Sequence, residues 1–369
     1  MNQLFRWDQM GLFLLALAAG ILPFAVPEVC AAALREGLTL CSGPLLLSLF
    51  PFLVVSRLLI QCPESDLLAL PFRLAAWGIG IRTPCAARVL CIGFLGGFAP
   101  AASAAAQAVR TGQLTAEEAD TLLPACICSG PSFVVLTVGQ SLLGSAELGV
   151  LLFASQITAN YLTAALLNRF AGMHSVKPGS AAPAFPAPPR LDEILADAAI
   201  TYCKLCGFIL FFRMLAAGAG ALLPAGAGTL CAVLLEVCSG CDLASRTGRW
   251  GSLLCCAALS VQGLSVLLQV RTICPPEMTL RPLYRSRLLH LPLSLALFYL
   301  LLPGGEADVF STLPVRVLLK RRVPPDCALL VFAVCCMAAC TLRSGIRQVE
   351  QKQMARNAGG CCINSKTLL

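Results

Sequence analysis

Charged residues are scarce in this chain, and the signature motifs of several enzyme classes are absent. Only 12% of the 369 residues are charged, whereas 57% are hydrophobic and the mean hydropathy is +0.80. Because a soluble domain carries roughly 25% charged residues, this composition argues against a soluble protein and predicts an integral membrane protein. The chain has no G-x-x-x-x-G-K phosphate loop, no G-x-S-x-G nucleophile turn and no H-E-x-x-H zinc pair. We therefore expect neither enzymatic activity nor a cofactor.

Cysteine, in contrast, is abundant, with 21 residues in the chain. Two pairs have the C-x-x-C spacing of a zinc or redox site, namely Cys203 with Cys206 and Cys238 with Cys241. Most of the other cysteines lie inside apolar runs, where cysteine behaves as a small hydrophobic residue. We favour this second interpretation and expect no metal site. So many unpaired thiols suit a lipid environment or the reducing side of a membrane.

The net charge of +8 raises the question of a nucleic-acid partner. The basic residues, however, lie in short loops and at the carboxyl end, as in Lys320, Arg321 and Arg322, without the interleaved aromatic residues of a stacking platform. This distribution is typical of cytoplasmic loops that follow the positive-inside rule. We therefore expect no nucleic-acid partner and a cytoplasmic carboxyl tail.

The apolar runs predict an all-α polytopic membrane protein. A transmembrane helix needs about 20 apolar residues, and the chain offers about eight to ten membrane-embedded segments on this criterion. The first run reads as a membrane helix rather than a cleavable signal peptide, because it continues directly into more hydrophobic chain. Runs of spanning length lie at about 10–33, 44–62, 147–168, 194–223 and 283–302, and less regular ones at 84–110, 117–143, 225–240 and 250–270.

A stretch rich in proline and alanine, residues 173–190, cannot form a span and predicts an exposed linker. It divides the chain into a first membrane half, 1–172, and a second membrane half, 191–303. Residues 304–369 form a basic hinge, a short hydrophobic segment at 327–342 and a tail. That segment, at about 16 residues, is short for a span and is also compatible with an interfacial helix.

The two halves share an order of interruptions and spans. The first half has a break at 93–103, a second at 128–139 and an uninterrupted helix at 149–170, and the second half repeats this order at 235–245, 259–270 and 283–302. Paired interrupted segments at corresponding positions indicate the binding site of a secondary transporter. Whether the repeat is parallel or inverted stays open.

Interrupted helices predict an enclosed polar cavity, because irregular backbone within a membrane is tolerated only inside protein or beside water. Half-helices that begin at a break direct free N–H groups inward, which suits a carboxylate. The alternative is that small residues at the breaks only allow close helix packing. The candidate substrate-binding residues are Ser129, Gly130, Pro131, Ser132, Glu236, Ser239, Gly240, Ser265 and Gln269.

Glu236 lies in an apolar run, where an ionised carboxylate must be paired, hydrated or protonated. It either couples or gates transport or forms the structural half of an ion pair. The coupling or ion-pair candidates are Glu236, Asp242, Arg213 and Arg271. We expect Arg57 either to reach the membrane interface or to face a substrate anion. We expect Arg281, Arg285 and Arg287 to mark a membrane border, and His290 to anchor at the interface. Thr115 and Glu118 have the spacing of a capping box at a helix start.

Five segments carry a resemblance to a known family. In order they are GFLGGFAPAAS, TAEEADTLLPACICSGPSFVVLTVG, LLEVCSG, GLSVLLQV and LRPLYRSRLLH. They resemble the nucleoside-recognition, or Gate, region and the YlbJ-type sporulation integral membrane proteins, over residues 34–302. The resemblance implies two Gate-like halves with broken or re-entrant helices. It also implies a bacterial protein of the outer forespore membrane that moves dipicolinic acid. The chain departs from the family at 96–101, which reads GGFAPA instead of an SGYP-like segment, and at Leu267, where the family has histidine; Gln269 is retained.

The resulting hypothesis is a sporulation-associated permease that moves a small anionic solute, first of all dipicolinic acid, across the outer forespore membrane. Its partners are this solute and the lipid bilayer, with a homo-oligomer or other sporulation membrane proteins left open. One alternative is a carrier of nucleosides or other small anions. Another is a non-transporting scaffold that recruits sporulation partners through its basic tail.

Overall fold

The protein is built from helices alone in the part that the computed structural model describes, residues 2–62, 65–170 and 191–302. Of these residues 87% are helical and none lies in a strand. The expected all-α fold is therefore confirmed. The linker at 173–190 and the hinge, short segment and tail within 304–369 lie outside the described residues.

The first part of the chain contains short and long helices joined by tight connections. Helix α8 begins with the expected capping box, because Thr115 Oγ1 accepts from the Glu118 N–H and Glu118 Oε2 accepts from the Thr115 N–H. The elements are α1 (Asn2–Ala25), α2 (Pro27–Ser42), α3 (Pro44–Gln61), α4 (Ser65–Leu68), α5 (Leu70–Ile79), α6 (Pro84–Gly96), α7 (Phe98–Arg110), α8 (Ala116–Cys126), the π-helix η1 (Ser132–Leu142) and α9 (Ala146–Phe170).

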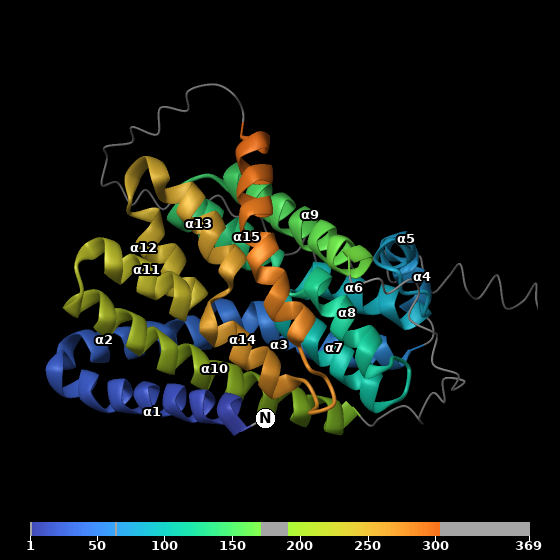
Figure 1. The fold of residues 1–369 in the computed structure, drawn as a ribbon, viewed down its shortest axis with the longest axis horizontal. Helices are drawn as coiled ribbons and strands as arrows, with labels where there is room; N and C mark the ends of the chain where they lie inside the picture. The colour runs from blue at the N-terminus through green and yellow to red at the C-terminus, as the bar shows by residue number, and fades with distance from the viewer. Residues whose placement is uncertain (1, 63–64, 171–190, 303–369) are drawn as a thin grey trace, which may run out of the picture.

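The second part begins with the longest helix and ends with a helix that packs back onto the first part (Figure 1). Its elements are α10 (Leu191–Leu222), α11 (Ala225–Leu235), α12 (Val237–Ser245), the 3₁₀ turn η2 (Gly248–Trp250), α13 (Gly251–Val261), α14 (Gly263–Ile273) and α15 (Arg281–Leu301).

The lengths and compositions of these helices are those of an integral membrane protein. Within the described residues, four helical stretches are long and apolar enough to cross a membrane, and a fifth joins α5 and α6 across a bend of 107°. Four shorter apolar helices accompany them, including Leu49–Gln61 and Ala225–Leu235. Large apolar side chains such as Phe24, Leu47 and Leu300 are exposed on the outer faces, as lipid-facing positions require.

Two sets of six helices pack in corresponding ways. The first set is α3, α6, α7, α8, η1 and α9, and its members correspond in this order to α10, α11, α12, α13, α14 and α15. When two helices pack together, their two counterparts pack together in most cases. The pair α7–α14 maps onto η1–α12, α8–α15 onto α9–α13, and α3–α6 onto α10–α11, while α3–α10 and α9–α15 map onto themselves. The arrangement of two breaks followed by a span is therefore repeated in space.

The two self-exchanging pairs show that the repeat is inverted. Along α3 and α10, Leu45 packs with Ile209, Phe50 lies against Tyr202, and Arg57 pairs with Asp197, so these helices are antiparallel. Helices α9 and α15 are antiparallel too, because Gln156 contacts His290 and Asn160 contacts Arg287. In both pairs, a helix of one set therefore runs opposite to its counterpart in the other set. The two sets have opposite orientations, so the repeat is inverted rather than parallel, which the sequence alone left open.

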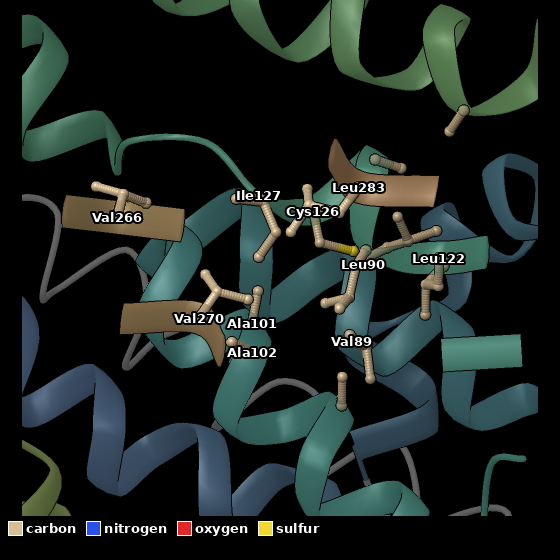
Figure 2. Packing of buried hydrophobic residues seen from close by; sticks show 14 of the residues in the cluster. Val89, Leu90, Ala101, Ala102, Leu122, Cys126, Ile127, Val266, Val270 and Leu283 are labelled. Carbon is tan, nitrogen blue, oxygen red and sulfur yellow. The ribbon is translucent and has the colours of Figure 1, made fainter. Parts of the chain in front are cut away.

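The largest hydrophobic core lies where the two sets meet. Figure 2 shows side chains of α6, α7, α8, α14 and α15 interdigitating, among them Leu90, Ala101, Leu122, Val266 and Leu283. Helix α7 is lined with buried alanines, and small residues let membrane helices approach closely without a hydrophobic driving force between them. This close packing brings the interrupted segments to the centre of the fold.

Candidate functional site

All four predicted interruptions are present. Helix α6 ends at Gly96 and α7 begins after Gly97, which has a positive φ of 81°. Helix α8 ends at Cys126 and η1 begins only at Ser132. Glu236, in an extended conformation with φ −151°, separates α11 from α12, and Gln262, in the left-handed region with φ 66°, separates α13 from α14. The helices are therefore not continuous through any of these places.

The four breaks meet one another. A methyl group on Gly97 would lie 2.6 Å from the Gly130 nitrogen, so only glycine permits this contact between the first two breaks. A methyl group on Gly263 would lie 3.0 Å from the Glu236 nitrogen, which places the last two breaks in contact as well. The Gln262 amide donates to Ser129 Oγ over 3.4 Å and joins the two pairs. The contact of Gly97 and the contact of Gly263 lie at corresponding places in the two helix sets.

A cavity of about 50 Å³, the break cavity, is lined by residues at the first three interruptions and by α14, the helix that follows the fourth. Its wall combines accessible backbone, two hydroxyls, one amide and one carboxylate with apolar side chains of α3, α10 and η1. The lining residues are Leu45, Leu49, Gly96, Phe98, Ser129, Gly130, Ser132, Phe133, Ile209, Glu236, Val237, Cys238, Val266 and Gln269. Glu236 is the one ionisable acid or base among them, apart from the Cys238 thiol.

Glu236 caps the helix that follows it. Its Oε1 accepts from the Cys238 N–H at 2.8 Å and its Oε2 accepts from the Ser239 N–H at 2.7 Å, while only 2% of the residue is exposed. The amino end of a helix stabilises an anion, and two charge-assisted hydrogen bonds offset part of the cost of burial. These two N–H groups were expected to face a solute; in this conformation the protein's own carboxylate occupies them.

Two buried amides near the cavity have an oxygen without a partner. Gln269 donates to Ser265 Oγ at 2.9 Å, and Gln262 donates to the Leu259 carbonyl at 2.6 Å, but neither Oε1 accepts a hydrogen bond. Both residues are at most 2% exposed. A buried acceptor without a partner costs about 1–3 kcal/mol, so a molecule that supplies donors would be stabilised here.

The structure brings together five of the nine candidate substrate-binding residues. Ser129, Gly130, Ser132, Glu236 and Gln269 line the break cavity, whereas Pro131, Ser239, Gly240 and Ser265 are not part of its wall. Those four have visible local roles or positions instead. Ser239 donates its N–H to Glu236, Ser265 accepts from Gln269, Gly240 packs against the backbone of Val233, and Pro131 directly precedes η1.

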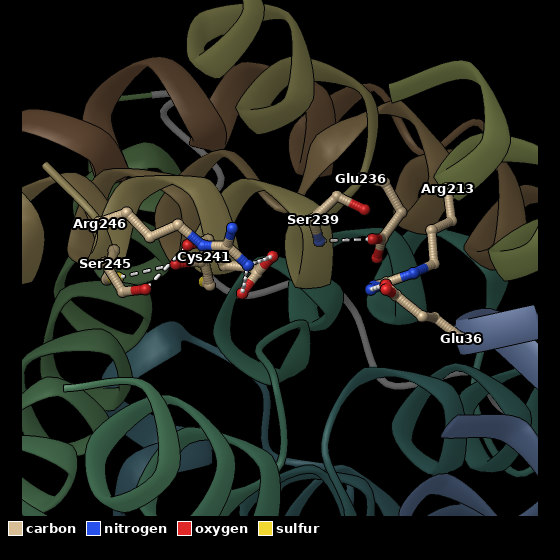
Figure 3. A network of polar contacts seen from close by, with 9 residues as sticks. Glu36, Arg213, Glu236, Ser239, Cys241, Ser245 and Arg246 are labelled. Atoms are coloured by element: carbon tan, nitrogen blue, oxygen red, sulfur yellow. Dashed lines mark hydrogen bonds and ion pairs between the residues drawn. The ribbon is translucent and has the colours of Figure 1, made fainter. Parts of the chain in front are cut away.

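The coupling candidates do not form one ion-pair network. Arg213 pairs with Glu36 of α2 at 2.7 Å, Asp242 pairs with Arg246 on the same helix at 2.8 Å, and Arg271 donates to the Met278 carbonyl at 2.5 Å. Figure 3 shows the Glu236 and Arg213 side chains on one side of the view and Arg246 on the other. Among the described residues Glu236 has no ion-pair partner.

Arg287 is a buried residue that sequence reasoning assigned to the membrane border. Its guanidinium, which has no acidic partner among the described residues, donates to Asn160 Oδ1 at 3.1 Å. It also donates to three backbone carbonyls at the ends of α8 and α13, those of Pro124, Ile127 and Ser260, at 3.3–3.5 Å. Carbonyls at a helix carboxyl end carry partial negative charge, so one cation joins the second and fourth breaks.

His290 is buried as well, so its expected place as an interfacial anchor is wrong. It is 1% exposed, and its Nε2 lies 3.2 Å from the Gln156 carbonyl, while Nδ1 has no partner. One turn earlier on the same face of α15 lies Arg287. The signal was present in the sequence, because positions 283, 287, 290 and 294 follow helical spacing and all four residues are buried.

The C-x-x-C pairs do not assemble a metal centre in the part of the chain that the structure describes. Cys203 and Cys206 lie on α10, and Cys238 and Cys241 lie on α12. No group of three or more His, Cys, Asp or Glu side chains among the described residues is placed to hold a metal ion.

Comparison of the whole chain with known protein families, with curated proteins and with solved structures found no match.

Proposed function

We propose that this protein is a membrane permease whose solute binds in the break cavity. The observation that carries the proposal is that four interruptions, far apart in sequence, contact one another, and that three of them line one cavity. Unpaired backbone groups facing lipid cost several kcal/mol each, so interruptions collected in the interior serve a purpose there. Inverted repeats with broken helices at their centre support transport in particular. A scaffold would have no use for this arrangement.

The solute that we propose is a small anion, with dipicolinate first because of the resemblance of the sequence to sporulation membrane proteins. That resemblance also motivates the proposed location in the outer forespore membrane. An anion in the break cavity would meet the carboxylate of Glu236, so its binding requires compensation. Either Glu236 carries a proton in the loaded state, or Arg213, one helical turn beyond the lining residue Ile209, turns from Glu36 towards the cavity.

The break cavity has to widen before it can hold such a solute. Its volume of about 50 Å³ suffices for a few waters, since one water needs roughly 10–15 Å³, whereas dipicolinate has about a dozen non-hydrogen atoms. We propose that η1 is the element that moves. It contributes Ser132 and Phe133 to the wall, and π-helical segments are rare and concentrated at functional sites.

A nucleoside or a similar neutral solute is the second candidate. It is favoured by the unpaired Oε1 atom of Gln269 and by the Glu236 carboxylate, because both line the break cavity and both are acceptors. A nucleoside brings hydroxyl and N–H donors and no charge, so it needs no compensating proton. The two candidates therefore differ in the pH dependence and in the charge movement of transport.

Uptake into proteoliposomes tests the proposal. We expect the full-length protein to take up radiolabelled dipicolinate faster than empty liposomes, with unlabelled dipicolinate competing and uridine not competing; the reverse pattern would favour the second candidate. Gln269→Ala and Ser129→Ala should lower kcat/KM about tenfold, because each removes a polar group from the break cavity. The matched control is Asp242→Asn on the surface of α12, which should transport like the unmodified protein. Folded protein that moves neither solute would refute the proposal.

A cellular experiment tests the assignment to sporulation. In the bacterium that encodes this chain, deletion of the gene should yield spores poor in dipicolinate, while the mother cell still accumulates it. Spores with normal dipicolinate content would contradict the assignment without touching the proposed permease activity.

A further inference from the structure

A second cavity, of about 180 Å³, opens at one end of the helices that flank the break cavity. We call it the basic cavity, and the residues of its wall that matter here are Arg57 of α3, Arg110 of α7, Asp197, Thr201 and Lys204 of α10, and Thr272 of α14. The break cavity is also lined from α3, α7, α10 and α14. The two cavities therefore lie along one four-helix bundle.

The basic cavity carries an excess of positive charge. Arg57 pairs with Asp197 at 2.5 Å and donates to Thr201 at 3.3 Å, so one cation is balanced. Arg110 donates only to the Ile273 carbonyl, at 3.4 Å, and Lys204 is exposed; neither has an ion-pair partner among the described residues. Three basic side chains against one carboxylate leave a net charge of plus two, which attracts a dianion.

The helix registers place the two cavities one above the other. On α3, Leu49 lines the break cavity and Arg57 lines the basic cavity. On α10, which runs in the opposite direction, Ile209 lines the break cavity and Lys204 lines the basic cavity. At 1.5 Å per residue, these steps correspond to roughly 7–12 Å along the bundle. A solute that leaves the basic cavity in this direction reaches the break cavity after about the length of one small molecule.

A hydrophobic cluster separates the two cavities. Buried Leu53 and Leu205 form its centre, and Leu49, Phe98 and Ile273 pack with them. Leu205 and Ile273 also line the basic cavity, whereas Leu49 and Phe98 line the break cavity. The cluster thus borders both cavities, and its apolar side chains hinder the passage of a charged group until they move apart.

From this arrangement we infer that the basic cavity is an access site, at which the transported anion binds before it passes the cluster around Leu53 and Leu205 into the break cavity. The inference rests on the proposed function and specifies the route and the first contacts of the solute. The ligand chemistry is that of a dicarboxylate, held by Arg110 and Lys204 through charge-assisted hydrogen bonds.

The test compares Arg110→Gln/Lys204→Gln with the matched control Arg249→Gln/Arg281→Gln, which removes two exposed basic side chains elsewhere. All four residues are exposed, so folding should be unaffected. Dipicolinate uptake by the access-site variant should show a KM raised about tenfold with kcat unchanged, because the local concentration of the anion falls. Raising the salt from about 0.01 M to about 1 M should bring the unmodified protein towards the variant, since screening shortens the Debye length to about 3 Å.

The outcomes separate this inference from the proposed function. If the unmodified protein transports dipicolinate and the variant has the same KM as the control, the access site is refuted and the permease stands. If the unmodified protein neither transports nor binds dipicolinate, both fail together. An anionic lipid headgroup is the other source of this chemistry. Weaker binding of the variant to phosphatidylglycerol vesicles, with its KM for dipicolinate unchanged, would assign the basic cavity to lipid and overturn the inference.

Discussion

Replacing Glu236 by glutamine should destabilise the protein measurably, although the two side chains have nearly the same shape. In the structure each carboxylate oxygen accepts one backbone N–H, at 2.8 Å from Cys238 and 2.7 Å from Ser239. Glutamine keeps one acceptor and turns its amino group towards the other N–H. One charge-assisted hydrogen bond, of about 1.5–3 kcal/mol, is therefore lost.

Two further terms act on the same substitution in opposite directions. The favourable interaction of a carboxylate with a helix amino end, about 0.3–1 kcal/mol, is lost. In return, a buried group no longer carries charge, which recovers part of its desolvation cost. We estimate a net loss of about 2 kcal/mol, which for a chain of this size corresponds to a decrease in Tm of about 3 °C.

Thermal unfolding in detergent, followed by circular dichroism at one fixed scan rate, measures this effect. Glu236→Asp keeps the charge and a good capping residue, so it should retain most of the Tm that glutamine loses. Asp242→Asn, on the same helix but away from the cap, should shift the Tm by less than about 1 °C. If Glu236→Gln unfolds at the temperature of the unmodified protein, the cap contributes little and our account of this break is wrong.

Three other predictions concern the breaks. Gly97→Ala should prevent stable folding, as judged by size-exclusion chromatography, because the added methyl group would lie 2.6 Å from the Gly130 nitrogen. The control Gly112→Ala, also at positive φ but with open space around it, should lower the free energy of unfolding by only about 1 kcal/mol. Arg287→Met should lower the Tm by at least 4 °C, because it leaves helix-end carbonyls without a donor, and wild-type Tm would disprove this role. Cys238, which lines the break cavity, should react with a small thiol reagent and be protected by dipicolinate, whereas buried Cys128 should not react. Peptide mass spectrometry distinguishes the two cysteines. Labelling of Cys128 alone would contradict the cavity assignment.

The positions of the breaks could be predicted from sequence because the signal is local. Glycine, serine and proline in otherwise apolar runs mark places where a membrane helix cannot continue, and Gly97 and Gly263 both have a positive φ. The capping box at Thr115 is local in the same sense, since all its atoms lie within one turn. The repeated order of breaks and spans follows from counting along the chain.

The partners of charged residues could not be predicted, because they depend on how helices cross. Arg213 and Glu36 are 177 positions apart and meet only because α10 packs on α2. Glu236 itself fills the helix end that sequence reasoning reserved for a solute. Arg287 was misplaced because exposed Arg281 and Arg285 shortly precede it, and the run of arginines hides the helical spacing that buries only the last of them.

The inverted repeat is not complete in its chemistry. The break at Gly97 corresponds to the break at Glu236 when the two helix sets are exchanged, yet the first contributes Gly96 and Phe98 to the wall of the break cavity and the second contributes a carboxylate. An alternation in which each set adopts the other's conformation would therefore not return the molecule to an energetically equivalent state. If transport exchanges the conformations of the two sets, as the proposed function requires, this single acidic side chain would make one orientation of the carrier more stable at rest than the other.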